Sequence, residues 1–249
     1  MPYVDDFSRQ AGEYRRHRPH YPDALFAYLA GLAPGRTLAL DCGTGNGQAA
    51  GGVARQFAAV VATDASARQI ANAAPHPRVT YKVAPADQSG LANRSVDLIT
   101  VAQAMHWFDL PAFYAEARRV LRPGGVLAAW CYHLIDVDPA LNRVFERFFE
   151  EIIGPYWSPG AEWVSDHYRT IPFPFAEVAT PDFMLEVDWV LEDLVGYFKS
   201  WSGRQRFMDM HGYDPLDDIR DELAAAWGDP QTRRPIRWPL YFRIGRIPG

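Results

Sequence analysis

Three glycines at alternating positions follow a short apolar run in the first fifth of the sequence. Residues 38–47 read Leu-Ala-Leu-Asp-Cys-Gly-Thr-Gly-Asn-Gly, and a segment with helical spacing comes next. Because glycine has no Cβ atom, Gly43, Gly45 and Gly47 can take left-handed dihedral angles and let a ligand approach the backbone at the carboxyl end of a strand. This turn predicts a nucleotide-type pocket.

The acidic residue at the start of the turn, Asp41, indicates which nucleotide would bind. A dinucleotide fingerprint needs glycine at its first, third and sixth positions, and counting from Gly43 the sixth position is Gln48. A carboxylate at Asp41 would oppose a bound pyrophosphate, but it suits the cationic amino end of S-adenosylmethionine, directly or through water. We therefore expect S-adenosylmethionine as the cofactor, held by Asp41 and the three glycines.

A second carboxylate, Asp64, comes seventeen residues after Gly47, at the end of the apolar run 60–63. At a strand end it can accept hydrogen bonds from both ribose hydroxyls of the cofactor. Its neighbours Ala65 and Ile70 could then cover one face of the adenine. The alternative is that Asp64 caps the helix that follows; with the glycine turn upstream, we favour ribose binding.

The turn after the next apolar run offers a contact for the adenine ring. Asp87 could accept a hydrogen bond from the adenine amino group while the backbone amide of Ala86 donates to the ring. The competing explanation is that the Asp87 side chain stabilises its own turn. We favour adenine binding and include both residues in the predicted cofactor site.

Residues 95–108 form an apolar run that opens into a turn rich in aromatic residues. In a parallel sheet the carboxyl ends of the strands face the ligand, so Ala102 and Gln103 should touch the methionine part of the cofactor. His106 and Trp107 should then lie near the methyl acceptor as the catalytic residues. For His106, a hydrogen-bonded histidine with a structural role only is an equal alternative.

The elements that must position these residues alternate between short apolar runs and longer segments with helical spacing, which is typical of βαβ units and a parallel sheet. The expected strands are residues 37–40, 60–63, 79–83, 96–101 and 126–130. The expected helices are residues 48–57, 67–73 and 112–121, the last one stopped by the Arg-Pro-Gly-Gly of residues 122–125. We expect an α/β fold, a Rossmann-like doubly wound sheet with helices on both faces.

The rest of the sequence predicts further helices and two late strands. The helices are expected at residues 5–16, 22–32, 140–153, 191–201 and 215–227, and the strands at 183–190 and 236–244. The two late strands predict an antiparallel pair at one edge of the sheet. Residues 154–181, rich in proline and aromatic residues, predict a long ordered loop or lid.

No internal repeat or linker divides the sequence, so we expect one domain over residues 1–249. Within that domain we distinguish four parts by their patterns. They are an amino-terminal helical cover (1–34), a cofactor-binding core (35–135), a helix with an aromatic lid (136–182), and carboxyl-terminal strands and helices (183–249).

Composition limits the partners of the chain. Its 25 basic and 30 acidic residues give a net charge of −5, which disfavours phosphate backbones, so we expect a small-molecule substrate and no nucleic acid. No signal-peptide pattern or membrane-length apolar stretch occurs, which predicts a cytoplasmic protein with no membrane partner. Cys42 and Cys131 lie in apolar runs and predict free buried thiols, and no CxxC pair suggests a metal site. A monomer and a homodimer are both open.

The order of these motifs resembles that of the class I S-adenosylmethionine-dependent methyltransferases over nearly the whole chain. Other motifs are similar to the subgroup that contains the trans-aconitate methyltransferases: Phe7-Ser8 with Tyr14, residues 18–22, His106-Trp107-Phe108, residues 119–125 and Ser200-Trp201-Ser202. The resemblance implies a seven-stranded, mostly parallel sheet whose last strand is antiparallel. It also implies that the amino-terminal segment folds over the cofactor and places Tyr14 and Arg18 near its methionine carboxylate.

Two kinds of methyl acceptor are consistent with the sequence. A carboxylate is ionised at neutral pH and needs only a cationic clamp, for which Arg18, His133, Arg169 and Arg204 are candidates. A phenol or hydroxyl must lose a proton, and His106 or His133 has a suitable ordinary pKa. A set of aromatic residues suggests a planar or apolar acceptor, with core packing as the alternative: Tyr156, Trp157, Trp163, Tyr168, Phe173 and Trp201.

Three rival functions are also considered. An NAD(P)-dependent oxidoreductase is disfavoured by the missing sixth-position glycine and by the absence of a Tyr-x-x-x-Lys pair. A nucleic-acid methyltransferase should carry an Asn-Pro-Pro-aromatic motif, whereas residues 103–106 read Gln-Ala-Met-His. A non-catalytic or regulatory S-adenosylmethionine-binding protein would keep the same motifs. We expect an enzyme that transfers a methyl group to a small-molecule carboxylate or other oxygen nucleophile.

Overall fold

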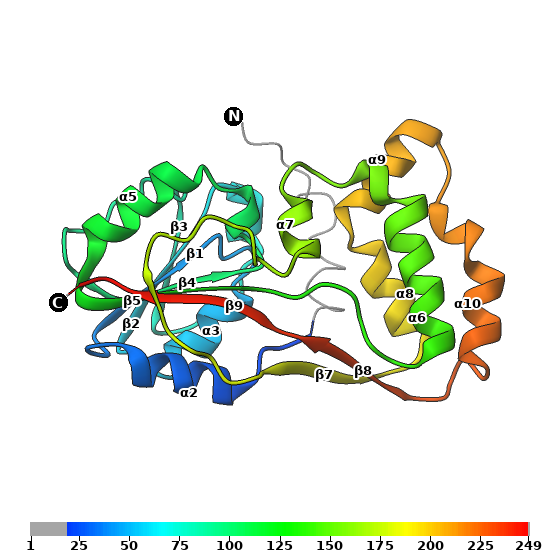
Figure 1. The fold of residues 1–249 in the computed structure, drawn as a ribbon, viewed down its shortest axis with the longest axis horizontal. Coiled ribbons are helices and arrows are strands. Elements are labelled where there is room, and N and C mark those ends of the chain that lie inside the picture. Colours follow the sequence, from blue (N-terminus) through cyan, green and yellow to red (C-terminus); the bar gives the residue numbers. More distant parts are fainter. Residues whose placement is uncertain (1–18, 249) are drawn as a thin grey trace.

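The computed structural model describes residues 19–248. These residues form two lobes, one built around a sheet and the other built mainly of helices, which we call the sheet lobe and the helical lobe (Figure 1). Three sequence predictions lie outside the described residues, namely the helix at residues 5–16 and the cofactor contacts of Tyr14 and Arg18.

The sheet lobe holds a seven-stranded sheet in the order β3-β2-β1-β4-β5-β9-β6. The first five strands along the chain are parallel, and β9 runs antiparallel to β5 and to β6. The strands are β1 Leu38–Cys42, β2 Ala59–Asp64, β3 Val79–Val83, β4 Val96–Ala102, β5 Leu121–Cys131, β6 Ala176–Glu177 and β9 Tyr241–Arg246. The predicted mostly parallel sheet with an antiparallel last strand is confirmed. The order reverses between β1 and β4, and doubly wound sheets bind ligands at the carboxyl ends of such strands.

Side chains on the central strands alternate between two buried faces. Ala39 belongs to the cluster that includes α2 (Asp23–Leu32) and α3 (Gln48–Ala54), and Leu40 belongs to the cluster that includes α5 (Leu110–Val120). Figure 1 shows α5 on one side of the sheet and α2 and α3 on the other. A strand covered on both faces must be apolar almost throughout, which explains why these runs do not alternate with polar residues.

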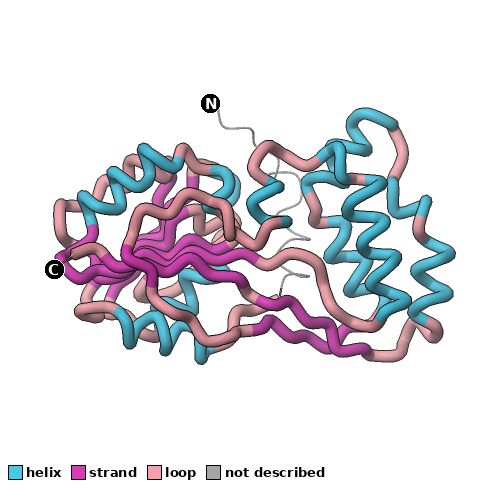
Figure 2. Tube along the Cα trace, in the orientation of Figure 1, coloured by secondary structure: helices cyan, strands magenta, loops and turns pink. Residues whose placement is uncertain are grey.

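The helical lobe is built from the second half of the chain (Figure 2). Its elements are α6 Pro139–Glu146, the π-helical turn η2 Arg147–Ile152, the 3-10 turn η3 Gly154–Tyr156, α8 Leu191–Lys199, α9 Ser202–His211, η4 Pro215–Asp218 and α10 Arg220–Trp227. Sequence analysis missed α9 because Phe207 is its one large apolar buried residue, and the other buried positions are Ser202, Gly203 and Arg204. Without an apolar stripe, a helix leaves no periodic signal.

The two late strands pair antiparallel as predicted, but the prediction that they do so at an edge of the main sheet is wrong. Strands β7 (Met184–Trp189) and β8 (Arg234–Pro239) form a separate two-stranded antiparallel sheet that leads from the sheet lobe to the helical lobe. The run expected at residues 236–244 is two strands, because the chain leaves β8 after Pro239 and enters the main sheet as β9 at Tyr241. Strand β9 then separates β5 from the short edge strand β6.

Residues 154–181 contain more regular structure than the predicted loop or lid. They include η3, which contacts α9 in the helical lobe, then α7 (Ala161–Ser165), and β6, which pairs with β9 of the main sheet. We call residues 166–178 the strap. The strap is held along α5, where the Tyr114 hydroxyl donates to the Pro172 carbonyl and the Arg118 guanidinium donates to the Pro174 carbonyl. This segment is therefore packed along the sheet lobe over much of its length.

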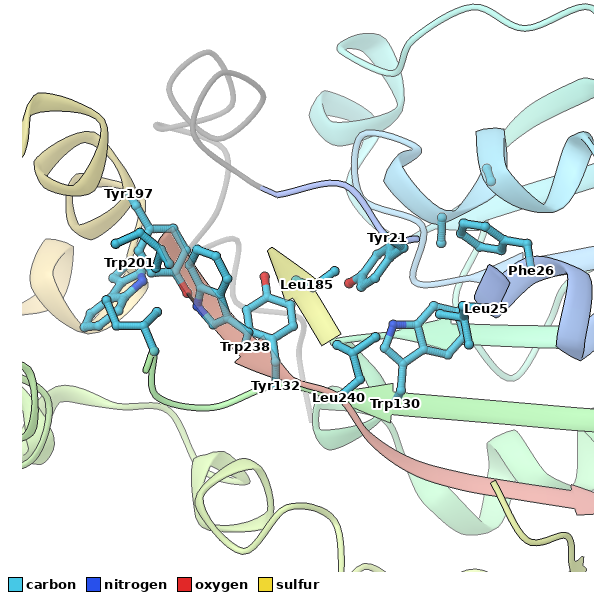
Figure 3. Packing of buried hydrophobic residues seen from close by; sticks show 14 of the residues in the cluster. Tyr21, Leu25, Phe26, Trp130, Tyr132, Leu185, Tyr197, Trp201, Trp238 and Leu240 are labelled. Carbon is cyan, nitrogen blue, oxygen red and sulfur yellow. Dashed lines mark hydrogen bonds between the residues drawn. The ribbon is translucent and has the colours of Figure 1, made fainter. Parts of the chain in front are cut away.

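One apolar cluster runs through both lobes, and Figure 3 shows part of it from Phe26 and Leu25 at one end to Tyr197 and Trp201 at the other. Cys42 and Cys131 are free and buried, as predicted. Among residues 19–248, no helix combines the length and the apolar character needed to cross a membrane.

Candidate functional site

The glycine turn has the left-handed backbone that the sequence predicts, with φ of 68° at Gly43, 56° at Gly45 and 90° at Gly47. A Cβ atom at Gly43 would lie 2.6 Å from the Cβ of Ala104, so the turn after β4 packs directly on the glycine turn. A Cβ at Gly47 would lie 2.2 Å from the hydroxyl of Tyr81, whereas a Cβ at Gly45 would meet nothing within 4 Å. The turn is thus closed at both ends and open above Gly45, where a ligand can approach the backbone.

Asp41 lies beneath this turn and is fully buried. Its two carboxylate oxygens accept hydrogen bonds from the hydroxyls of Thr44 (2.5 Å) and Thr100 (2.6 Å), which ties β1 to β4 and to the turn. Burial raises the pKa of Asp41 to about 6, the two hydroxyls oppose that rise, and the nearby charge of Asp64 adds to it. Asp41 can therefore act on a cationic ligand by its charge, through the low-dielectric interior.

Asp64 links the glycine turn to the end of β2. Its carboxylate accepts hydrogen bonds from the backbone N–H groups of Gly45 (2.8 Å) and Ser66 (2.9 Å). The cap of α4 (Ala67–Ala71) is Ser66, whose hydroxyl accepts from the N–H of Gln69, so capping does not account for Asp64. An ionised carboxylate has about four acceptor positions, so a side chain of this kind can accept from ribose hydroxyls as well as from backbone N–H groups.

Two polar residues that sequence analysis missed lie in the same region. Asn46, between Gly45 and Gly47, is buried, and neither its amide oxygen nor its amide nitrogen has a hydrogen-bond partner among residues 19–248. The side-chain oxygen of Gln69 on α4 is likewise buried and has no partner in that range. Unsatisfied buried polar atoms are rare and costly, so a cluster of them beside an open turn fits a polar ligand such as a nucleoside. The sequence feature that could have identified Asn46 is its position between Gly45 and Gly47, two glycines of the predicted turn.

The predicted adenine contacts follow the ends of neighbouring strands. Ala65 is exposed and Ile70 half-buried on the segment after β2. The turn with Ala86 and Asp87 begins beside it, because the N–H of Ala84 donates to the backbone carbonyl of Asp64 at 3.0 Å. The Asp87 carboxylate makes no hydrogen bond to any residue between 19 and 248, so the alternative of a side chain that stabilises its own turn is wrong.

Beyond the carboxyl end of β4, the side chain of Gln103 continues the hydrogen bonding to the neighbouring chain segment. Ala102 pairs with Trp130 of β5, and the next residue, Gln103, has a left-handed backbone with φ of 53°. The Gln103 amide nitrogen donates to the carbonyl of Tyr132 at 3.1 Å, and its amide oxygen accepts from the N–H of Tyr132 at 2.9 Å. These two bonds use one N–H and one oxygen lone pair of the Gln103 amide, and the Gln103 backbone N–H donates to the Trp130 carbonyl at 2.8 Å.

His106 and Trp107 lie on the 3-10 turn η1 (Met105–Trp107), immediately after the part of the chain that packs on Gly43. The Nδ1 atom of His106 is 2.8 Å from the hydroxyl of Tyr168, which belongs to the strap and is fully buried. Burial lowers the pKa of His106 to about 3, so its imidazole is neutral at neutral pH. Trp107 is 36% exposed, with its ring centroid 5.1 Å from that of His106.

Comparison with known proteins agrees with this geometry. The family model described as a methyltransferase domain matches residues 40–129, which span the glycine turn, Asp64 and the end of β4. A protein of Dictyostelium discoideum named as a methyltransferase is 36% identical over 252 residues, covering 98% of this chain and 95% of that protein. The chain belongs to the class I S-adenosylmethionine-dependent methyltransferases.

Two further proteins are similar to this methyltransferase over most of its length. A solved structure described as a Type II methyltransferase from Anaeromyxobacter dehalogenans is 46% identical, with a TM-score of 0.86, and the alignment covers 93% of this chain and 99% of that one. The malonyl-[acyl-carrier protein] O-methyltransferase of Dechloromonas aromatica is 31% identical over 255 residues, covering 93% of this chain and 89% of that protein. S-adenosylmethionine is the cofactor, and the buried unpaired groups at Asn46 and the open backbone at Gly45 fit its nucleoside.

The cationic clamps considered for the methyl acceptor are engaged elsewhere. Arg204 is buried and binds Asp214 through two nitrogens, at 2.5 and 2.8 Å. Arg169 pairs with Asp166 on the surface of the strap. His133 is 3.3 Å from the Ser165 hydroxyl, and burial lowers its pKa to about 4, so it is neutral at neutral pH. Within residues 19–248, none of these three candidates offers an unpaired positive charge.

The aromatic residues assigned to a lid divide between two packed regions. Trp157 and Trp201 pack on each other with ring centroids 5.8 Å apart in the helical lobe, where Tyr156 packs on Phe207. In the sheet lobe, Tyr168 is part of the apolar cluster under α5, and the remaining two pack against that cluster: Trp163 and Phe173. Core packing explains most of these residues, and Tyr168 alone contacts a predicted catalytic side chain.

A buried donor at the end of β5 has no partner. Trp130 is fully buried, and its indole Nε1 makes no hydrogen bond in the described part of the chain. The ring of Tyr21 meets it edge-on, with centroids 5.3 Å apart. Figure 3 shows the Trp130 nitrogen and the hydroxyls of Tyr21 and Tyr132 turned toward the same central space. Trp130 pairs with Ala102, directly before the Gln103-Tyr132 link at the carboxyl ends of β4 and β5.

Proposed function

We propose that this methyltransferase transfers the methyl group of S-adenosylmethionine to an oxygen nucleophile of a small molecule bound at the carboxyl ends of β4 and β5. The observation that carries the proposal is the unpaired indole N–H of Trp130, which is fully buried at that position. A buried donor without a partner costs free energy, which is recovered when a bound molecule supplies an acceptor atom. Oxygen-bearing acceptors supply one.

The surrounding polar groups support oxygen over an amine. An amine acceptor is cationic at neutral pH before it reacts and needs carboxylates or carbonyls around it. The acidic residues on and after α7 are already engaged, because Glu162 accepts from the N–H of Gly160 and Asp166 binds Arg169 and Thr170. The relative from Dechloromonas aromatica, named for O-methylation of a malonyl group, supports the same choice.

The side chains on the cofactor side have a separate task. The cofactor supplies an already activated methyl group, so the protein mainly has to align the acceptor with it and exclude water. Asp64 and Asn46 would hold the nucleoside, and the buried charge of Asp41 would favour the cationic form of the ligand. Alignment of two reactants can contribute about 7–11 kcal/mol to lowering the barrier.

The predicted rival functions fit the site less well. Two carboxylates, Asp41 and Asp64, lie at the glycine turn where a dinucleotide would place its pyrophosphate. A nucleic-acid acceptor would meet a chain with a net charge of −5. A non-catalytic binding protein would have no use for a buried unpaired donor at the acceptor side. These points support a small-molecule O-methyltransferase. They apply equally to a monomer and to a homodimer.

The proposal is tested with matched acceptors. The purified protein is incubated with S-adenosylmethionine and with carboxylates, phenols, alcohols and amines of similar size, and S-adenosylhomocysteine release is measured. We expect turnover with oxygen acceptors. Replacement of Trp130 by Phe keeps an aromatic ring but removes the N–H, and should raise KM for the acceptor about tenfold, the cost of one hydrogen bond.

The control for that variant is Trp227→Phe. Trp227 is also fully buried, but its indole donates to the Thr232 carbonyl in the helical lobe, so its loss should lower stability without changing KM. Turnover of amines alone, or a Trp130→Phe enzyme with an unchanged KM for its acceptor, would contradict the proposal.

A further inference from the structure

His106 and Tyr168 are 62 residues apart in sequence and meet above the glycine turn. His106 follows the stretch that touches Gly43, and Gly160 at the start of α7 approaches the His106 backbone so closely that a Cβ there would lie 2.4 Å from the His106 carbonyl oxygen. His106 is half-buried as a residue, and its Nε2 atom makes no hydrogen bond to residues 19–248. One ring nitrogen is thus held by the protein, and the other is available to a ligand.

The position of Tyr168 is fixed from several sides. Both His167 and Tyr168 have left-handed backbones, with φ of 58° and 59°, which is unfavourable for residues with a side chain. The Tyr168 N–H donates to the Trp163 carbonyl at 2.7 Å, and the Tyr168 carbonyl accepts from the Arg243 guanidinium at 2.9 Å. A strained conformation held by this many contacts indicates that the placement of the phenol matters.

The relative hydrogen-bonding strengths of phenol and imidazole decide which nitrogen of His106 carries the proton. A phenol donates a hydrogen bond more readily than it accepts one, and a neutral imidazole nitrogen accepts more readily than a phenol oxygen. The Tyr168 hydroxyl therefore donates to Nδ1 of His106, 2.8 Å away. Nδ1 is an acceptor in that arrangement, so the imidazole carries its own proton on Nε2.

Ionisation does not disturb this arrangement near neutral pH. Burial raises the pKa of Tyr168 well above its ordinary value, so the phenol keeps its proton. Burial also lowers the pKa of His106, which stays uncharged. The other titratable groups that act on Tyr168 are Cys131 and Tyr114, and burial raises the pKa of each, so they too keep their protons.

We propose that Tyr168 is a positioning residue that holds His106 in the Nε2–H form, so that His106 donates a hydrogen bond to an anionic oxygen of the methyl acceptor and does not act as a base. This inference rests on the proposed function and narrows it to carboxylates. A carboxylate needs no proton removed before it is methylated, and an Nε2–H donor orients and stabilises it. A phenol or alcohol would need a group that accepts its proton, and the Nε2 atom of His106 cannot do so in this form because it already carries a proton.

Nuclear magnetic resonance tests the tautomer without any turnover. The full chain, with S-adenosylhomocysteine present, is labelled with nitrogen-15, and the ring nitrogens of His106 are assigned by its loss in His106→Gln. We expect a protonated Nε2 and a bare Nδ1 from pH 6 to 8. In Tyr168→Phe a mixture of tautomers should appear, while the control Tyr114→Phe, which loses a structural hydroxyl bond to Pro172, should leave the spectrum unchanged. A protonated Nδ1 in the wild type would overturn the proposal.

Kinetics with a panel of small carboxylates, phenols and alcohols tests the role. Glutamine can place an N–H near the position of Nε2 but cannot accept a proton as a base, so His106→Gln should keep kcat/KM for carboxylates within about tenfold. His106→Leu should lose about 100-fold, because the bound carboxylate loses a hydrogen bond that is strengthened by its charge. Equal losses in the two variants, faster turnover of phenols than of carboxylates, or turnover of no carboxylate would each refute the inference. The affinity of every variant for S-adenosylhomocysteine is measured separately, because its loss would count against the site as a whole and not against the role of His106.

Discussion

The side-chain amide of Gln103 replaces a strand in pairing with the backbone of Tyr132. Its nitrogen donates to the Tyr132 carbonyl and its oxygen accepts from the Tyr132 N–H, at 3.1 and 2.9 Å. The regular pairing of β4 with β5 ends one residue earlier, at Ala102 and Trp130. Gln103 therefore prolongs the ladder across the point where the two strands separate. It fixes Trp130 and Tyr132 relative to the turn that carries His106.

The first prediction concerns this link. Gln103→Met has similar length but no hydrogen-bonding head, so it leaves both polar backbone groups of Tyr132 without their partner. We expect the free energy of unfolding to fall by about 1–3 kcal/mol. The left-handed backbone of residue 103 is equally unfavourable for Gln and Met, so the difference in unfolding free energy between the two proteins measures the contribution of the amide group. The measurement is chemical denaturation.

Gln88→Met is the matched control, because Gln88 is exposed and its side chain makes no hydrogen bond in residues 19–248. Its stability should change by no more than about 0.5 kcal/mol. Similar stability of the two variants would show that the Gln103 amide does not hold the strand ends together.

The second prediction compares two glycines of one segment. Gly47 has φ of 90°, and a Cβ there would meet the Tyr81 hydroxyl at 2.2 Å, whereas a Cβ at Gly51, within α3, would meet nothing within 4 Å. We expect Gly47→Ala to destabilise the protein by about 1–3 kcal/mol and to weaken cofactor binding. Gly51→Ala should stabilise it by about 0.5–1 kcal/mol, because alanine is the better helix former. Thermal unfolding shows whether each variant is more or less stable than the wild type. A Gly47→Ala protein with wild-type stability and normal cofactor affinity would rule out a conformational requirement at this turn.

The sequence was sufficient for the parts of the site that depend on local rules. Apolar runs alternating with helical segments gave the parallel strands, because a strand covered on both faces must be apolar. The pattern Asp41-x-Gly43-x-Gly45-x-Gly47 required a left-handed turn at a strand end, and all three glycines have positive φ. The ends of β2 and β4 then had to flank this turn, because parallel strands present their carboxyl ends on one edge.

Other features depend on which distant residues meet, and a single sequence does not reveal that. The contact of His106 with Tyr168 spans 62 residues, and the role of Trp130 depends on the absence of a partner. The place of the late strand pair was predicted wrongly, because alternation shows that a segment is a strand but not which sheet it joins. Arg204 was a reasonable clamp by residue type, and only the fold brings Asp214 against it.

The third prediction follows from the buried carboxylate of Asp41. Its pKa in the folded protein is raised to about 6, above the ordinary value of 3.8. A raised pKa means that the stabilising form is the protonated one, so this stability is present below pH 4 and is lost as the pH rises through 6. Relative to the wild type, Asp41→Asn should therefore gain up to about 3 kcal/mol of unfolding free energy between pH 4 and pH 7. Denaturation curves across this range measure the gain.

The same variant should bind the cofactor less well. S-adenosylmethionine carries a sulfonium charge that S-adenosylhomocysteine lacks, and the charge of Asp41 attracts it. We expect Asp41→Asn to lose about tenfold more affinity for S-adenosylmethionine than for S-adenosylhomocysteine, as measured by calorimetry at pH 8. In the wild type, the preference for S-adenosylmethionine should decline as the pH falls below about 6. Equal losses for the two ligands would show that the carboxylate acts through the turn geometry and not through its charge.

The last prediction concerns Arg243 of β9, which holds the strap in place. One guanidinium nitrogen donates to the carbonyls of Tyr168, Arg169 and Ile171, at 2.9, 3.1 and 3.2 Å, and another pairs with Glu177 at 2.8 Å. Its side chain is 14% exposed, so removing it leaves several carbonyls poorly satisfied. We expect Arg243→Met to lose about 2 kcal/mol or more of unfolding free energy, and Arg243→Lys to recover only part of it, because an ammonium lacks the planar fork.

Arg169→Met provides the comparison, because the guanidinium of Arg169 is 74% exposed and its pair with Asp166 should contribute no more than about 0.5 kcal/mol. Hydrogen exchange in the strap distinguishes a local from a global effect. In Arg243→Met, amides around Tyr168 should exchange faster at conditions where the central strands remain protected, because the left-handed backbone there has lost its support. If the two arginine variants are equally stable and the strap exchanges normally, then the position of Tyr168 is set by packing under α5 alone, and the guanidinium is dispensable.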